Sequence, residues 1–361
     1  MKTFQKCKNL PAKNAKVLLL THIDADGSGA SIVFRAVFDD ITVRYCSNGF
    51  MSENIRKAVC EEADKYDYII ACDISCNAED AEAIDRSNGK KKFVLLDHHI
   101  SAIDLNKYDW AIVKPEITVG SFRHLHSYNT THMLKDGHSS GASLAYDFAE
   151  YAGLIPAKSK YSQSPALERS IYTLQELVTL IAGYDTWDWV NLFNKDREYK
   201  DINTLFGIYG QEMFEERFLN KVLGGEDIFD ETDYLLLKIE SEKINSYLKR
   251  TEKGFKTGTL TSGDTEYSAV FVSANDYLAD VFARMQEVYP GYDLYVASYG
   301  TGISVRATKP EINVGEIVKK VGGGGHAGAG GIKIKQDIIL NLIGNTIGMT
   351  LTVDKEKEGK W

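Results

Sequence analysis

The sequence has no long hydrophobic run, few cysteines and no apolar leader. No apolar stretch among its 361 residues approaches the roughly 20 residues that a membrane-spanning helix requires. Residues 1–14 are basic but lack the apolar core of a signal peptide. The five cysteines are odd in number and form no CxxC pair, which argues against a disulfide framework or a zinc site. These absences favour a cytoplasmic protein without a membrane segment.

Positive charge is also scarce. The 42 lysines and arginines are outnumbered by 51 aspartates and glutamates, so the formal net charge is −9. Proteins that hold long nucleic acid usually present a broad basic surface, and this balance therefore argues against such a partner. A pocket for metal ions needs several carboxylates, which would account for part of the acidity. The apolar content of 43% supports ordinary globular cores, and the length suffices for two domains.

Predicted strands and helices alternate along the first hundred residues. This alternation predicts a parallel sheet with right-handed crossovers. The expected strands are residues 16–20, 41–46, 67–71 and 92–96, and the expected helices between them are residues 31–38, 53–63 and 78–84.

A segment from residue 116 to residue 138 breaks this pattern and carries His124, His126, His132 and His138. It is either a lid or a substrate-selecting insertion. We expect its histidines to be solvated rather than part of a site.

From residue 140 onward, the sequence predicts a helical region, and after it a second domain of strands and short helices. The expected helices are residues 140–153, 167–185, 201–217 and 232–253, the last of them a connector between domains. Beyond it, residues 257–261 and 267–273 alternate like an antiparallel pair. A helix, two further strands and a short helix follow, at residues 277–288, 293–298, 302–307 and 314–321.

Three of the predicted strand ends carry carboxylates or imidazoles. These residues are His22, Asp24 and Asp26 after the first strand, Asp73 after the third, and Asp97, His98 and His99 after the fourth. The carboxyl ends of parallel strands lie along one edge, where open α/β sheets place their active sites. Oxygen and imidazole ligands that converge there predict a site for divalent metal.

Each motif taken alone also has a structural interpretation. Asp24 or Asp26 could cap the helix that follows, and Asp73 could be a cap or a turn residue. Two imidazoles beside an aspartate are harder to explain in this way. Alternation sends His98 and His99 to different sides, so that one could bind metal while the other faces a substrate.

The end of the predicted helix 167–185 leaves two choices open. Asp185 or Asp188 can supply a further carboxylate, and the sequence does not decide between them. Trp187 and Trp189 either stack nucleobases or pack in the core or between domains. We expect packing.

Taken in order, these motifs resemble the DHH phosphoesterases. The resemblance rests on the motif HxDxDGxG at residues 22–29, on Asp73, on the DHH triplet at residues 97–99, and on Asp185. The run GGGGHAGAGG at residues 322–331 resembles the glycine-rich motif of the family's C-terminal DHHA1 domain. The resemblance implies an α/β fold with three parts: a parallel-sheet DHH domain at residues 1–228, a connector helix at 229–254, and a smaller α/β DHHA1 domain with a mixed sheet at 255–361.

The resemblance further implies a centre of two Mn²⁺ ions, for which Mg²⁺ or Co²⁺ could substitute. By position, His22, Asp24 and Asp73 would bind one ion, and Asp26, Asp73, His98 and Asp185 the other. Asp73 would bridge the two ions, Asp97 would orient an imidazole, and His99 would face the scissile phosphate. A hydroxide bridging the ions would attack phosphorus in line.

Substrate binding is assigned by the same resemblance. The glycine run is either a flexible linker or a place where bare backbone brings N–H groups close to a phosphate. The resemblance implies that the substrate's terminal phosphate or base is held by Gly323, Gly324, Gly325 and His326, and that Arg306 binds phosphate. Without the family context, Arg306 could equally be an arginine on a surface strand.

The family hydrolyses several kinds of phosphoester, and the sequence narrows the choice. We expect no room for the extra domains of long single-strand exonucleases, and the glycine-rich motif argues against the pyrophosphatase branch. The expected function is therefore a two-metal exonuclease of oligoribonuclease type that degrades short RNA or DNA oligonucleotides to mononucleotides. The alternatives are an enzyme for small nucleotides such as 3′-phosphoadenosine 5′-phosphate or a linear dinucleotide, a single-stranded DNA exonuclease, and, least favoured, a non-catalytic nucleotide-binding protein. No membrane partner is expected, and a homodimer is compatible with the resemblance.

Overall fold

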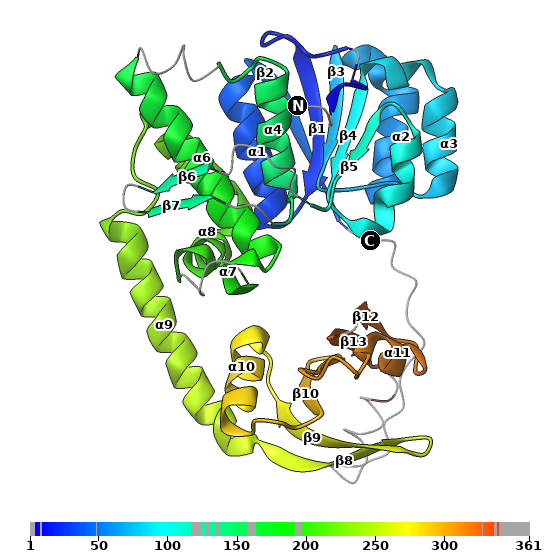
Figure 1. Ribbon diagram of the computed structural model, residues 1–361, viewed down its shortest axis with the longest axis vertical. Helices are drawn as coiled ribbons and strands as arrows, with labels where there is room; N and C mark the ends of the chain where they lie inside the picture. Colours follow the sequence, from blue (N-terminus) through cyan, green and yellow to red (C-terminus); the bar gives the residue numbers. More distant parts are fainter. Residues whose placement is uncertain are drawn as a thin grey trace, which may run out of the picture. The chain divides into compact units, whose positions relative to one another are not determined.

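The computed structural model describes residues 4–338 apart from residues 8, 48, 117–123, 128–129, 134–136, 157–163, 192–196, 327 and 336–337. The chain folds into two compact units, Met1–Leu237 and Lys238–Trp361, which are drawn in Figure 1. The domain boundaries expected at residues 228 and 254 stay a prediction. In the part of the chain that the structure describes, we find no helix with the length and apolar character to span a bilayer.

A parallel sheet of five strands forms the centre of the first unit, in the order β2-β1-β3-β4-β5. The strands are β1 (Lys16–His22), β2 (Asp40–Cys46), β3 (Tyr68–Cys72), β4 (Phe93–Asp97) and β5 (Ala111–Val113). All residues of β3, β4 and β5 are buried, as in sheets covered on both faces. Cys72 pairs with Thr21 on one side and with Leu96 on the other. His22, Asp73 and Asp97, which follow these three residues, therefore lie at the same edge of the sheet.

Helices cover both faces of this sheet (Figure 1). One face carries α1 (Ala25–Val37), α4 (Gly141–Tyr151) and α6 (Pro165–Asp185), and the other carries α2 (Met51–Glu61) and α3 (Ala78–Arg86). Neighbouring residues of β1 point to opposite faces, so Leu19 joins the core with α1 and α4 while Leu18 joins the core with α2 and α3. Strand β5 was not expected, because three residues are too few to show a period.

The remainder of the first unit is mostly helical. Its further elements are the 3₁₀ turns η2 (Ala63–Lys65), η3 (Asn88–Lys92) and η4 (Ile100–Lys107), the strands β6 (His124–Ser127) and β7 (Thr130–Met133), and the helices α7 (Asp188–Asn191) and α8 (Arg197–Gly224). Helix α9 (Glu231–Thr251) leads from the first unit into the second. Strands β6 and β7 pair as an antiparallel hairpin. The rest of the predicted insertion lies partly outside the described residues, so its role stays a prediction.

A mixed sheet of six strands forms the second unit, in the order β12-β13-β11-β10-β9-β8. Its elements are η5 (Glu252–Gly254), β8 (Lys256–Ser262), β9 (Thr265–Ser273), α10 (Leu278–Val288), β10 (Leu294–Tyr299), β11 (Gly302–Arg306), α11 (Val314–Lys319), β12 (Gly324–His326) and β13 (Ala329–Lys333). Strands β9 and β10 are parallel, and the other pairs are antiparallel. Helix α10 packs in one apolar core of this unit and α11 in a second.

The glycine run is not a flexible linker, because it contributes to the two paired strands β12 and β13. A Cβ at Gly325 would lie 2.3 Å from the carbonyl oxygen of Ala329, and one at Gly330 would lie 2.8 Å from Val318 of α11. Side chains at these positions would push the strands and the helix apart. Close packing is therefore one physical reason for glycine in this run.

Candidate metal centre

The turn from β1 into α1 places three of the expected ligands. Asp24 is the N-cap of α1, and its Oδ1 accepts a hydrogen bond of 3.0 Å from the backbone N–H of Gly27. The other oxygen, Oδ2, lies 2.5 Å from Nδ1 of His22. A Cβ at Gly27 would lie 2.3 Å from the carbonyl oxygen of His22, so the turn requires glycine there. Asp24 therefore caps the helix and contacts His22 at the same time.

Asp26 lies buried in the first turn of α1 and faces the start of another helix. Its carboxylate accepts hydrogen bonds from the backbone N–H groups of Gly141 and Ala142, at 2.5 and 3.0 Å. These groups belong to the first turn of α4, where unpaired N–H donors and the helix dipole favour an anion. The sequence analysis missed this contact, although Ser140 followed by Ser143 is a recognisable helix-start signal.

Asp73 follows β3 and is almost completely buried. Its backbone has φ of 62°, a region that few residues other than glycine adopt. Gly141 makes room for it, because a Cβ there would lie 2.3 Å from the Cβ of Asp73. Among the described residues, Oδ2 of Asp73 has no hydrogen-bond partner. Burial, together with the nearby charges of other carboxylates, Asp26 first among them, holds the pKa of Asp73 well above its usual range.

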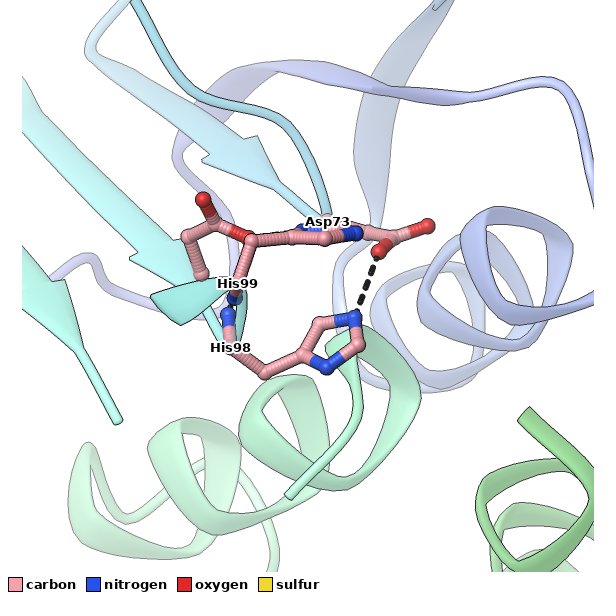
Figure 2. Close-up of side chains that lie close together, drawn as sticks. Asp73, His98 and His99 are labelled. Atoms are coloured by element: carbon pink, nitrogen blue, oxygen red, sulfur yellow. Dashed lines mark hydrogen bonds and ion pairs between the residues drawn. The ribbon is translucent and has the colours of Figure 1, made fainter. Parts of the chain in front are cut away.

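The DHH triplet sends its two imidazoles into different surroundings, as alternation predicts. His98 is 14% exposed, and its Nε2 lies 3.2 Å from Oδ1 of Asp73; Figure 2 shows this contact. His99 is 53% exposed, and its Nδ1 lies 2.8 Å from Oδ1 of the buried Asp97. The same oxygen accepts hydrogen bonds from the backbone N–H groups of His98 and His99. Burial lowers the pKa of His98, whereas the hydrogen bond to Asp97 raises that of His99.

The end of α6 separates the two aspartates that the sequence left open. Oδ2 of Asp185 lies 3.6 Å from Nε2 of His98, so this carboxylate faces the centre. Asp188 is fully buried and binds His138 instead, through the backbone N–H at 2.8 Å and Nδ1 at 2.7 Å. The geometry favours Asp185 as the ligand. It also gives His138, which was expected to be solvated, a specific partner.

The two tryptophans beside these aspartates differ. Trp189 packs against the core, as expected. Trp187 exposes 50% of its surface, so it does not pack in the core, and its packing between domains stays a prediction.

Together these side chains form three groups whose ligand atoms lie within 4.8 Å of one another. The groups are His22 with Asp24 and Asp73; Asp26 with His98 and Asp185; and Asp73 with Asp97, His98 and His99. No lysine or arginine in the described part of the chain forms an ion pair with Asp24, Asp26 or Asp73. A cluster of carboxylates in which Asp26 and Asp73 are buried fits divalent metal ions, which favour oxygen and imidazole ligands.

The residues expected to bind substrate lie in the second unit. Arg306 ends β11 and pairs in the sheet with Ala329, which in turn pairs with His326. The backbone register therefore places Arg306 and His326 in one row across three strands. The guanidinium lies 5.2 Å from the ring centre of Phe282, and burial lowers the pKa of Arg306. In the part of this unit that the structure describes, no carboxylate forms an ion pair with Arg306. Its charge is therefore compatible with binding an anionic ligand.

Comparison with known proteins gives one family match and one curated relative. Residues 16–177 match the model of the DHH family, N-terminal domain. Oligoribonuclease NrnB of Bacillus subtilis (strain 168) is 27% identical over 330 residues, which cover 89% of this chain and 73% of NrnB.

Two solved structures are also similar to this chain. RecJ from Thermus thermophilus, in complex with Mn²⁺, has 13% identity and a TM-score of 0.49, and the match covers 93% of this chain and 52% of that one. The pGpG-specific phosphodiesterase PggH from Vibrio cholerae has 12% identity and a TM-score of 0.45, with 92% and 98% of the two chains covered. The ordered motifs and the match at residues 16–177 lead to one conclusion: this chain carries an N-terminal domain of the DHH family.

Proposed function

We propose that this protein is a two-metal phosphodiesterase that hydrolyses short oligonucleotides to mononucleotides. The observation that carries the proposal is the grouping of the six expected ligands, which come from four separate segments, around Asp73 at one sheet edge. The similarity to NrnB, whose name is oligoribonuclease, supports short RNA as the substrate.

Two groups of residues would hold the ions. They are His22, Asp24 and Asp73 for one ion, and Asp26, Asp73, His98 and Asp185 for the other. Mn²⁺ is the ion proposed, with Mg²⁺ or Co²⁺ as substitutes. Such ions supply positive charge against phosphoryl oxygens and lower the pKa of a bound water. The proposal for Asp73 as the shared ligand is supported by its burial and by its unpaired Oδ2.

The surrounding backbone would orient these ligands. The hydrogen bonds from Gly141 and Ala142 fix the carboxylate of Asp26, and the bond from Gly27 fixes that of Asp24. A carboxylate oxygen has two lone pairs, so an oxygen that accepts one N–H can still bind a metal ion. Supports of this kind determine ligand orientation and hence metal affinity.

His99 is proposed to face the scissile phosphate. Because its Nδ1 binds Asp97, its Nε2 remains available for the substrate. The raised pKa of His99 favours the cationic form, which can donate a hydrogen bond to a phosphoryl or leaving-group oxygen. Asp97 would act through His99 by holding the ring in place.

The second unit is proposed to carry residues that bind phosphate or base. Arg306 would bind a phosphate through its guanidinium, a group suited to phosphate geometry. Gly323, Gly324, Gly325 and His326 would hold the terminal phosphate or base. A site with few such contacts suits short substrates, because affinity for long nucleic acid depends on many phosphate contacts.

The test is a panel of labelled RNA and DNA, from two to about ten nucleotides long, together with 3′-phosphoadenosine 5′-phosphate and a linear dinucleotide, all with Mn²⁺. The rate per molecule should be highest for the shortest oligonucleotides and should fall with length. The Asp73→Asn variant, purified in the same way, controls for a contaminating nuclease. Highest activity on 3′-phosphoadenosine 5′-phosphate or on the long strands would contradict the proposal, and so would full activity in chelator.

A further inference from the structure

Trp187 is exposed in the turn that follows the proposed ligand Asp185, although tryptophan is a residue that folded proteins usually bury in large part. Half of its surface is accessible, and it follows Asp185, whose carboxylate faces His98, by two positions. The mechanism proposed above leaves it without a role.

The turn that carries Trp187 is firmly held on both sides. The backbone N–H of Thr186 donates to the carbonyl of Ala182, and that of Trp187 to the carbonyl of Tyr184, both at 3.1 Å. On the other side, the fully buried Asp188 accepts two hydrogen bonds from His138. The exposure of Trp187 is therefore a property of an ordered turn rather than of a loose loop.

The ring also has a supporting layer beneath it. It meets Trp189 edge to face, with 5.7 Å between centroids and 76° between planes. Trp189 stacks in turn on Tyr184, with 6.0 Å between centroids, and both pack against the core. Such aromatic contacts hold a ring in a fixed orientation.

The backbone of Trp187 is strained, with φ of 63°. Among the described residues, only Asp73, Trp187 and Tyr277 have a positive φ without being glycine. Two of the three therefore lie in segments that carry proposed ligands, Asp73 itself and the turn after Asp185. Strain of this kind persists where the surrounding structure imposes it, and it gathers at functional sites.

We infer that Trp187 is a stacking surface for a nucleobase of the substrate, next to the phosphate bound at the metal centre. The inference rests on the proposed function, since it names what that site recognises besides phosphate. In a nucleotide, the base is joined to its phosphate through one ribose, and Trp187 follows the proposed ligand Asp185 by two residues in the chain. Every base has a flat π-face, so stacking would favour nucleotides over inorganic phosphates without selecting a sequence.

The test compares adenosine 5′-monophosphate with ribose 5-phosphate, which lacks only the base. Their dissociation constants are measured by calorimetry with Mn²⁺ for the wild type, Trp187→Gly and Trp187→Phe. Glycine suits a φ of 63°, so the first variant removes the ring without adding strain. Tyr234→Ala is the matched control, because Tyr234 is an aromatic residue of α9 with 57% exposure.

The wild type should bind the nucleotide about 5- to 150-fold more tightly than the sugar phosphate, the range expected for one stacked base. In Trp187→Gly this ratio should fall toward one while ribose 5-phosphate binds as before. Trp187→Phe should retain most of the ratio, and Tyr234→Ala all of it. Equal wild-type affinities, a ratio unchanged in Trp187→Gly, or equal loss of both ligands would overturn the inference.

This measurement separates the inference from the proposed function. If the ratio collapses in Trp187→Gly but the wild type cleaves no oligonucleotide, base stacking stands and the proposed reaction fails. If the wild type cleaves oligonucleotides but the ratio does not depend on Trp187, the reaction stands and the inference fails.

Discussion

The carboxylate of Asp73 lies among several others, and the chain accepts an unusual backbone conformation to place it there. The left-handed φ of 62° turns the residue out of β3, and Gly141 leaves room for its side chain. In the absence of metal, the charged form of Asp73 is unfavourable, as the upward shift of its pKa indicates. At functional sites, a residue that binds substrate or metal often lowers the stability of the fold.

Asp73→Asn tests this compromise. Asparagine tolerates the left-handed region and keeps the size of the side chain, but it removes the charge. Since a raised folded pKa means that the charged carboxylate destabilises the fold near neutral pH, we expect the metal-free variant to melt at a higher temperature than the wild type. It should bind Mn²⁺ weakly and lose activity by at least about 100-fold, more than the loss of a mere support usually causes.

The control for this variant is Asp188→Asn, since Asp188 binds His138 rather than the metal centre. It should retain Mn²⁺ affinity, measured by calorimetry, even where it lowers the melting temperature. An Asp73→Asn protein with wild-type turnover would refute the role of the shared ligand.

Arg306→Ala tests the phosphate site in the second unit. Removing a charge-assisted hydrogen bond should raise KM by roughly 10-fold or more, while Mn²⁺ affinity stays unchanged. Arg284→Ala is the control, because Arg284 on α10 already binds Glu252 and Glu287. An unchanged KM for Arg306→Ala, measured in steady-state kinetics, would argue against a phosphate contact.

At the scale of elements, the sequence predicted which helices and strands exist better than it predicted the contacts between them. The period of residues 140–153 predicts a helix, and α4 is there. Nothing in that period indicates that its first turn binds Asp26, because the contact joins residues more than a hundred positions apart. In the same way, the glycine run is visible in the sequence, but the carbonyl oxygens that require its glycines belong to the paired strand.

Asp293 joins elements of the second unit and gives a prediction about pH. Hydrogen bonds from Lys309, first, and from Ser268 lower its pKa to about 2. Because this folded value lies below the unfolded value, Asp293 contributes stability above about pH 4 that is lost as the pH falls from about 4 to about 2. In Asp293→Asn, the free energy of unfolding measured with urea should decline less over that range than in the wild type. Asp264→Asn, in the turn between β8 and β9, should follow the wild type.

At the scale of the whole molecule, the proposed metal ligands and the proposed phosphate-binding residues belong to different compact units. All proposed metal ligands belong to the unit Met1–Leu237, and Arg306 with the glycine run belongs to the other. A metal ion that binds only the folded state should therefore stabilise the first unit by mass action.

We expect Mn²⁺ at about 100 times its dissociation constant to stabilise the first unit by about 2.7 kcal/mol, or roughly 5–10 °C in melting temperature for a unit of this size. Hydrogen exchange with mass spectrometry should place the added protection at residues 22–29, 71–75, 97–100 and 181–188. Metal-free buffer with chelator serves as the reference. Equal protection in the second unit would contradict the assignment of the ions.

The sequence by itself determined the parallel sheet, the chemistry of its edge and the identity of the residues there, since period, residue type and order along the chain are local properties. Only the tertiary structure distinguished Asp185, which faces the metal centre, from Asp188, which binds His138. It also showed that the start of α4 binds Asp26 and that Trp187 is exposed whereas Trp189 packs against the core. The physical reason is that burial and hydrogen bonding at these positions depend on groups brought from distant parts of the chain, which no local pattern records.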